Sequence, residues 1–274
     1  MNRLTPSVIM AFVASASFAH TSDIEVSYTM RSFYQNGKER INTYHLLANN
    51  TYSKFYNPRS EEIDSLTSTP TGLANFKKTQ EAALKAMISQ GSIVVDKLPN
   101  KKEKDYVVKS VEDSTITVYD MVSNEGVYYI EPFSEMVWEI TDSTKNILGY
   151  ECISAETDYH GRKWTAWFAP DIPVQDGPWK FRGLPGLILE VSTDNHTSFC
   201  ADGIVQTSKE IKDIYGREKY EKQDRKEILR MRRAMVNNPE GALAAKGWSG
   251  LVKISSNQSK PKNDDYDFIE TDYR

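Results

Sequence analysis

Alternating apolar and polar residues form the main pattern of the chain. The alternation begins at residues 24–30, which read Ile-Glu-Val-Ser-Tyr-Thr-Met, and it favours a strand with one buried face. An Asn36-Gly37 pair follows, which is a strong signal for a tight hairpin turn. Return strands at 40–47 and 51–56 then complete a predicted antiparallel meander.

Short strand-like segments, separated by turn residues, continue through most of the chain. Short connections favour antiparallel neighbours, so the sequence predicts a mainly β (α+β) fold. We expect one large curved antiparallel sheet, or an open half-barrel by architectural analogy with periplasmic lipoprotein carriers. The further segments expected to form strands are 93–98, 105–111, 115–122, 126–131, 136–141, 147–157, 163–168, 187–192 and 198–207.

Two segments show helical periodicity instead. Apolar residues recur three or four positions apart near 72–90, and Gly91 ends this predicted helix. A second helix is predicted at 209–236, before Pro239. The second helix carries a basic run, which is either a solvated face or a surface for an acidic ligand or the envelope. That run consists of Arg225, Lys226, Arg230, Arg232 and Arg233.

The first nineteen residues have the features of a secretory signal peptide. Arg3 is their only charge, an apolar stretch follows at 8–18, and small side chains precede a cut after Ala19. An uncleaved anchor is the alternative, but this stretch is shorter than the roughly 20 residues needed to span a bilayer. The predicted division is therefore a signal peptide at 1–19, a single mainly β domain at 20–254 and a polar C-terminal tail at 255–274.

The charge balance is acidic, which argues against a nucleic-acid partner. The chain has 34 basic and 38 acidic residues, so losing Arg3 leaves 33 − 38 = −5. No segment after the signal peptide is apolar enough to cross a membrane. We therefore expect a periplasmic or otherwise exported protein that is soluble after cleavage, with no integral membrane segment.

Cysteine and histidine use suggests one disulfide and no metal. Exported proteins with two cysteines often pair them, so we expect a Cys152–Cys200 bond, with two buried thiols as the alternative. The four histidines show no recognised metal-ligand spacing with each other or with the cysteines. The sequence thus predicts neither a bound metal nor a cofactor.

A set of motifs in the second half of the chain resembles the GLPGLI family of exported bacterial proteins. The motifs are Ile-Leu-Gly-Tyr-Glu-Cys at 147–152, Gly-Arg-Lys-Trp-Thr-Ala-Trp-Phe at 161–168, and Gly-Pro-Trp-Lys-Phe-Arg-Gly-Leu-Pro-Gly-Leu-Ile at 177–188. The resemblance implies a cell-envelope protein found chiefly in one Gram-negative phylum, in a family of undefined function. The acidic stretch at 264–270 departs from the Asn-Pro ending of many members.

Two interpretations of these motifs remain open. Tight turns and apolar residues favour a structural loop that covers one end of the sheet. This structural motif consists of Gly183, Leu184, Pro185, Gly186, Leu187 and Ile188. In the second interpretation, a concave apolar site binds a ligand, and two arginines orient its anionic or carbonyl group. That predicted ligand site consists of Arg162, Trp164, Trp167, Trp179, Phe181 and Arg182.

The sequence favours a non-catalytic periplasmic binding or envelope accessory protein. It lacks the local signatures of a nucleophile elbow, a zinc protease or a phosphate loop, so no catalytic residue is assigned. An envelope hydrolase that uses His160 with a nearby carboxylate is one alternative. A structural component of an envelope assembly is another. The expected partner is an apolar or mixed small ligand, or an envelope protein.

Overall fold

The computed structural model covers most of the predicted elements. The predicted signal peptide at 1–19, the predicted Asn36-Gly37 turn and all but the last residue of the predicted strand at 93–98 lie outside the described residues. The described residues are 20–33, 39–91, 98–101, 103–122, 125–194, 196–237 and 268–273.

A single 12-stranded sheet dominates the structure and confirms the predicted mainly β, α+β fold. Two antiparallel meanders form it, and they join where β12 pairs with β2. The first meander contains β2 (Ile24–Phe33), β3 (Glu39–Ala48), β4 (Tyr52–Tyr56), β5 (Tyr106–Ser110), β6 (Thr115–Val122) and β7 (Glu125–Pro132). The second contains β8 (Glu139–Ile147), β9 (Tyr150–Tyr159), β10 (Arg162–Ala169), β11 (Leu187–Thr193) and β12 (Thr197–Gln206).

Short strands extend the edges of this arrangement. β14 (Tyr220–Lys222) adds to β7 as a parallel neighbour, while β1 (His20–Thr21) and β13 (Glu210–Ile211) form a separate two-stranded sheet. A 3-10 turn, η2 (Phe133–Glu135), begins the connection from β7 to β8 across the open side. A short piece of chain therefore links β7, next to one edge of the large sheet, to β8 at the other edge.

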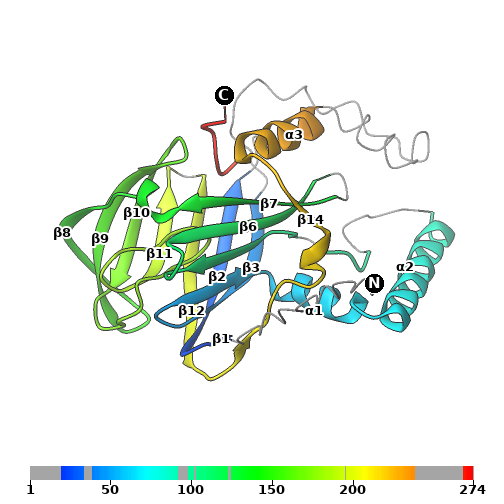
Figure 1. Ribbon diagram of the computed structural model, residues 1–274, viewed down its shortest axis with the longest axis horizontal. Helices are drawn as coiled ribbons and strands as arrows, with labels where there is room; N and C mark the ends of the chain where they lie inside the picture. Colours follow the sequence, from blue (N-terminus) through cyan, green and yellow to red (C-terminus); the bar gives the residue numbers. More distant parts are fainter. Residues whose placement is uncertain are drawn as a thin grey trace, which may run out of the picture.

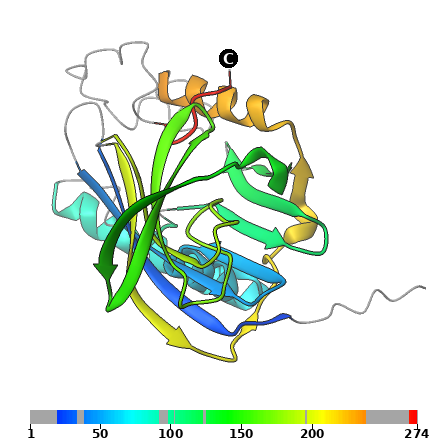
Figure 2. The same cartoon turned by 90° about the vertical axis from the view of Figure 1, so that its left-hand side faces the viewer.

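The sheet curves strongly around its inner face, as Figures 1 and 2 show. Because of this curvature, β7 near one edge reaches the turn between β9 and β10 near the other. Glu131 at the end of β7 has a carboxylate oxygen 2.9 Å from Nε2 of His160 in that turn. The structure is thus an open half-barrel whose two ends meet through side chains.

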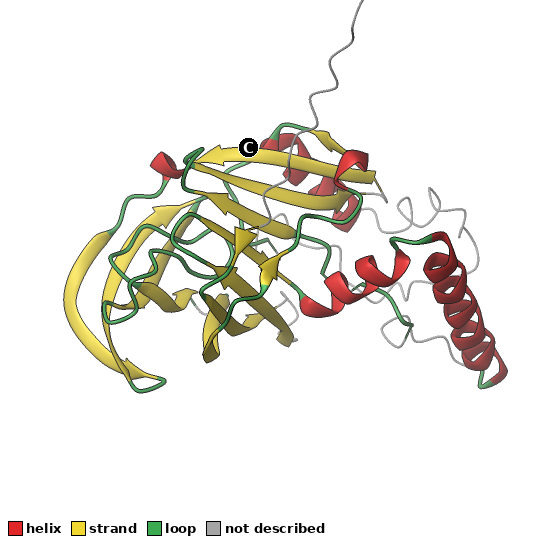
Figure 3. Cartoon of the chain, turned by 60° about the horizontal axis from the view of Figure 1, so that its bottom comes forward, coloured by secondary structure: helices red, strands yellow, loops and turns green. Residues whose placement is uncertain are grey.

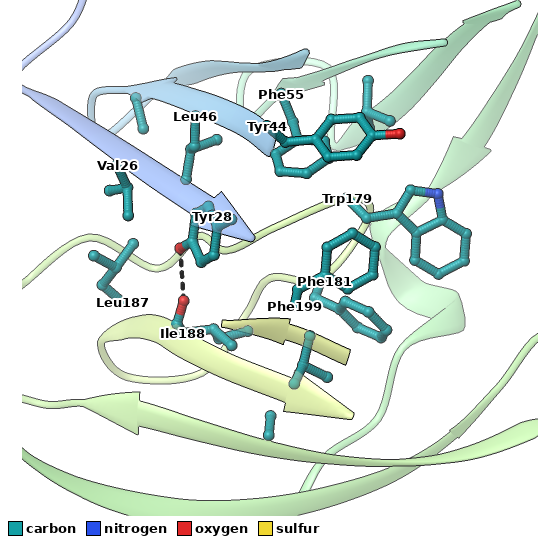
Figure 4. Packing of buried hydrophobic residues seen from close by; sticks show 14 of the residues in the cluster. Val26, Tyr28, Tyr44, Leu46, Phe55, Trp179, Phe181, Leu187, Ile188 and Phe199 are labelled. Atoms are coloured by element: carbon teal, nitrogen blue, oxygen red, sulfur yellow. Dashed lines mark hydrogen bonds between the residues drawn. The ribbon is translucent and has the colours of Figure 1, made fainter. Parts of the chain in front are cut away.

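The inner face is filled by alternate strand residues and by the 170–186 connection between β10 and β11. Figure 4 shows side chains from β2, β3, β4 and β12 packing against Trp179 and Phe181 of that connection. Tyr28 on β2 donates a 2.7 Å hydrogen bond to the backbone carbonyl of Ile188 on β11. The connection is therefore part of the hydrophobic core.

Three helices complete the described structure. α1 (Pro58–Thr67) was not predicted, although Asn57 caps it by accepting a 3.0 Å hydrogen bond from Ser60 N, and proline opens its first turn. α2 (Pro70–Ser89) confirms the predicted helix near 72–90 and stands to one side of the sheet (Figure 3). Within the described residues, no helix is both long and apolar enough to cross a membrane.

The helix predicted at 209–236 begins much later than expected. α3 (Arg225–Asn237) forms only its second half. The first half instead contains β13, which pairs with β1, then Gly216 with a left-handed φ of 68° that turns the chain, the 3-10 turn η3 (Arg217–Lys219) and β14. At the end of the expected polar tail, residues 268–273 contact the β9–β10 turn and the main core.

Candidate functional site

The four aromatic residues predicted to line a ligand site do not share one surface. The rings of Trp164, Trp179 and Phe181 are buried, and Phe181 lies 4.8 Å from Trp164 and 5.2 Å from Trp179 between ring centroids. Trp167 sits an odd number of positions from Trp164 on the same strand, so it points to the outer face, where Lys145 lies 4.4 Å from its ring. Most of the aromatic residues predicted to line a ligand site are thus part of the hydrophobic core.

The two predicted arginines serve different parts of the fold. Arg162 donates through Nε to the backbone carbonyls of Phe268 and Ile269, both at 3.1 Å. Arg182 stacks on the ring of Phe133, 3.4 Å from its centroid, and burial lowers the pKa of its guanidinium. The structure therefore does not bring these arginines together around the aromatic residues.

The glycine- and proline-rich motif at 183–188 contributes apolar side chains to the main core. Leu184, Leu187 and Ile188 are buried in the main core. Lys109 on β5 anchors the preceding residues through Nζ, which lies 2.5 Å from Asp176 Oδ1 and donates at 2.7 Å to the carbonyl of Gly177. Burial lowers the pKa of Lys109, while the Asp176 carboxylate opposes that change.

The expected disulfide is not formed. Cys152 and Cys200 are free thiols, on β9 and β12 respectively. Two other strands, β10 and β11, lie between them in the sheet, so the sulfur atoms are several strand spacings apart. Burial raises the pKa of both thiols, which disfavours their thiolate forms.

A buried charge cluster joins the two ends of the sheet. At its centre, Lys180 is fully buried, and its Nζ lies 2.7 Å from Glu131 Oε2 and 2.6 Å from Glu270 Oε1. Arg225 at the start of α3 lies 2.5 Å from both Glu270 and Asp272. We use "charge cluster" for Glu131, His160, Lys180, Arg225, Glu270 and Asp272.

His160 is enclosed by this cluster. Its Nε2 lies 2.9 Å from Glu131, and its Nδ1 lies 3.1 Å from Asp272. The sequence suggested an exposed hairpin tip, but residues 268–273 cover the tip and leave His160 7% exposed. Both ring nitrogens face carboxylates, so neither is directed at a substrate position as hydrolysis would require.

Three members of the cluster also have the geometry of metal ligands. One ligand atom from each of Glu131, His160 and Glu270 lies within 4.8 Å of the others. Lys180 already contacts both carboxylates at ion-pair distance, and Arg225 contacts both as well. Two resident cations thus supply the positive charge that a divalent ion would bring, and we assign no metal to the cluster.

Glu131 gives the cluster a predicted acid-sensitive contribution to stability. Burial opposes ionisation of Glu131, but Lys180 and His160 outweigh it and hold its pKa at about 2, below the ordinary 4.5. A depressed folded-state pKa adds stability above pH 4.5, and this contribution disappears as the pH falls toward 2. The melting temperature, measured by thermal unfolding, should therefore fall as the pH is lowered from 4.5 toward 2. The Glu131→Gln variant should have a lower melting temperature than the unmodified protein at neutral pH, and its melting temperature should fall less on acidification. Equal falls in the two proteins would contradict the proposed contribution of Glu131.

An inner cleft lies beside the charge cluster. It has a volume of about 470 Å³ and opens between the curved sheet, α3 and residues 268–270. Its apolar lining consists of Met30, Phe33, Tyr44, Phe55, Val118, Met121, Val122, Tyr129, Trp179, Phe199, Ile228, Leu229, Phe268 and Ile269. Of the predicted ligand-site residues, only Trp179 contacts this cleft.

Charged residues line another part of the cleft wall. Arg40 pairs with Glu103, and Arg232 of α3 pairs with Asp120. Burial and the nearby Glu103 carboxylate raise the pKa of Asp105 to about 6. The cleft therefore combines a large apolar surface with an acidic region, which suits a ligand of mixed polarity.

Sequence reasoning singled out His160 and Arg225 but not Glu131, which contacts both in the charge cluster, nor Lys180, which contacts Glu131. Glu131 follows Val127 and Tyr129 at alternate, inward positions of β7, and Lys180 stands between two buried aromatic residues. A charged residue at such a position is itself a signal of a buried partner. The ion-pair partners of Glu131 and Lys180 lie between 29 positions away (Glu131 to His160) and 94 positions away (Glu131 to Arg225), and no local pattern identifies them.

Comparisons with known proteins find one family model that matches a short stretch of the chain, and solved structures that are distantly similar in fold. A family model described as a protein of unknown function (Porph_ging) matches residues 156–190, which overlap the 147–188 segment that carries the GLPGLI resemblance. This is a minor part of the chain, and the GLPGLI name stays a prediction. No curated protein matches the chain.

Solved structures give a distant fold likeness. PNGF-II in a C2 crystal form is 14% identical with a TM-score of 0.50, and the match covers 77% of this chain but 32% of that one. Its P21 form is 15% identical, with a TM-score of 0.49 and coverage of 77% and 33%. A LolA superfamily protein from Nitrosomonas europaea is 8% identical, with a TM-score of 0.25 and coverage of 70% and 87%. This chain spans about a third of PNGF-II, and the likeness concerns the fold alone.

Proposed function

We propose that this protein is an exported, non-catalytic binding protein that holds an apolar or mixed-polarity ligand in its inner cleft. The main support is the 470 Å³ cleft, which is large enough for a small organic ligand and has both an apolar wall and an acidic region. The signal-peptide pattern at 1–19 supports export to the envelope. The ligand site differs from the aromatic cluster expected from the sequence.

The charge cluster gives this proposal further support over a hydrolase. His160 was the candidate base, yet it is buried between Glu131 and Asp272. Its imidazole therefore stabilises the junction between β7, the β9–β10 turn and residues 268–273. An envelope assembly protein remains the second candidate, with an envelope protein as its partner in place of a small ligand.

The proposal is tested by purifying the protein from its native envelope under mild conditions and recording native mass spectra. We expect a reproducible added mass, which denaturation releases as a small molecule. A protein that carries no small molecule, and binds none from an envelope lipid extract, would contradict the proposed binding function. Co-purification of a defined envelope protein instead would favour the assembly role.

A pair of tryptophan substitutions should locate the ligand. Ser32 lines the cleft, so Ser32→Trp should fill part of its volume and reduce bound ligand about tenfold or more. Ser198 lies on the neighbouring β12 and is half-buried on the outer face, so Ser198→Trp is the matched control and should retain the ligand. Occupancy is measured by native mass spectrometry. Equal occupancy in both variants would place the ligand outside the cleft.

A further inference from the structure

Residues 268–273, which we call the docked segment, contact the β9–β10 turn through their backbone. Thr271 N donates a 2.9 Å hydrogen bond to the carbonyl of His160, and Thr271 Oγ1 donates at 3.1 Å to the carbonyl of Gly161. The guanidinium of Arg162 binds the carbonyls of Phe268 and Ile269. The turn thus recognises the main chain of the segment at several consecutive residues.

Side chains of the docked segment are recognised as well. Glu270 contacts Lys180 and Arg225, while Asp272 pairs with Arg225 and His160. Tyr273 is 5% exposed, and its ring lies 6.3 Å from that of Phe268. The surrounding residues therefore form a socket with charge and shape complementary to two carboxylates flanked by aromatic residues.

Gly161 leaves the space in this socket that the docked segment occupies. Its φ of +80° is left-handed, and an added Cβ would lie 2.3 Å from Thr271 Oγ1. Gly149, at the tip of the β8–β9 hairpin, has a similar φ of +89°, but an added Cβ there would meet nothing within 4 Å. The close approach at Gly161 is thus specific to the docked segment.

Chain connectivity does not dictate where the segment binds. The Arg233 guanidinium of α3 lies 5.2 Å from the ring of Phe268, although residues 234–267 separate the two in sequence. A sequence separation of this length does not by itself fix which surface a later segment contacts. The contacts of the socket therefore select its position.

We infer that the socket is a peptide-binding site in its own right. Its ligand class is an acidic peptide in which an aromatic and an aliphatic residue precede Glu-x-Asp-Tyr. Its resident occupant is the docked segment of the same chain, and a second copy offers the same sequence. This inference does not depend on what the inner cleft holds.

The test uses the full-length chain with Glu270→Gln and Asp272→Asn, which weakens its own segment and leaves the socket intact. A fluorescent peptide of residues 268–274 is titrated and followed by anisotropy. We expect it to bind this double variant at least about tenfold tighter than the unmodified chain, in which the resident segment competes. A peptide carrying the same two substitutions should bind at least about tenfold more weakly.

Gly161→Ala and Gly149→Ala, each added to the double variant, provide the matched steric test. Gly161→Ala should abolish peptide binding, whereas Gly149→Ala should retain it, because only the first places a Cβ against the peptide. Absence of binding to the folded double variant, or equal binding by both glycine variants, would overturn the inference. A double variant without a cooperative melting transition would also overturn it, since the segment would then be an integral part of the core.

Discussion

Replacing Lys180 with methionine should lower the free energy of unfolding by about 3–5 kcal/mol. Its ammonium is fully buried and lies at ion-pair distance from the carboxylates of Glu131 and Glu270. Methionine fills similar space but leaves the two carboxylates with less compensating charge. Urea denaturation at neutral pH measures the loss.

The pH dependence of this loss identifies its electrostatic origin. One carboxylate of the Lys180→Met variant can be neutralised by a proton, so the deficit should shrink as the medium becomes acidic. Lys163→Met is the surface control, because Lys163 is 61% exposed and pairs with Glu156 on the outer face. That control should leave the stability unchanged. A deficit in Lys180→Met that is constant with pH would point to lost packing instead of charge.

The strands were predictable because each has an apolar face that the sequence records locally. β6 at Thr115–Val122 has the predicted bounds, and β5, β7, β11 and β12 agree within a residue or two. Their alternation follows from one side facing the core and the other facing solvent. The fold class could therefore be predicted from the sequence, apart from the closure of the half-barrel by long-range contacts.

The segment at 209–224 shows where local periodicity was misleading. Ile211 and Ile214 have helical spacing, yet both are buried in a satellite cluster beside the sheet. Ile211 reaches that cluster from a strand paired with β1, and Gly216 then turns the chain. Packing against an element some 190 positions earlier overrode the helical preference, as tertiary contacts commonly do.

The candidate site was predictable only in part, because aromatic residues in a motif can serve either packing or binding. Trp179 contacts both the core and the cleft, whereas Trp164 and Phe181 are core alone. The cleft also depends on Phe268 and Ile269, whose position follows from the charge cluster. The positions of Glu131 and Lys180 signal buried partners but not which residues these are, so only the folded structure connects the cluster with the docked segment.

Gly186 in the family motif should be intolerant of alanine for a reason that the sequence only hinted at. Its φ is +156°, and an added Cβ would lie 2.2 Å from the backbone oxygen of Ala169 at the end of β10. Backbone atoms cannot move aside as a flexible side chain would. The clash and the unfavourable conformation together should cost about 4 kcal/mol of unfolding free energy, measured by urea denaturation.

Gly183 in the same motif separates the effect of the clash from that of backbone conformation. It has a φ of +90°, but an added Cβ would meet nothing within 4 Å. Gly183→Ala should therefore cost only about 1 kcal/mol, from the left-handed backbone alone. Equal losses in the two variants would contradict the packing derived for this motif. A much larger loss at Gly186 would mean that the motif holds the 170–186 connection against β10, since the two glycines differ chiefly in that contact.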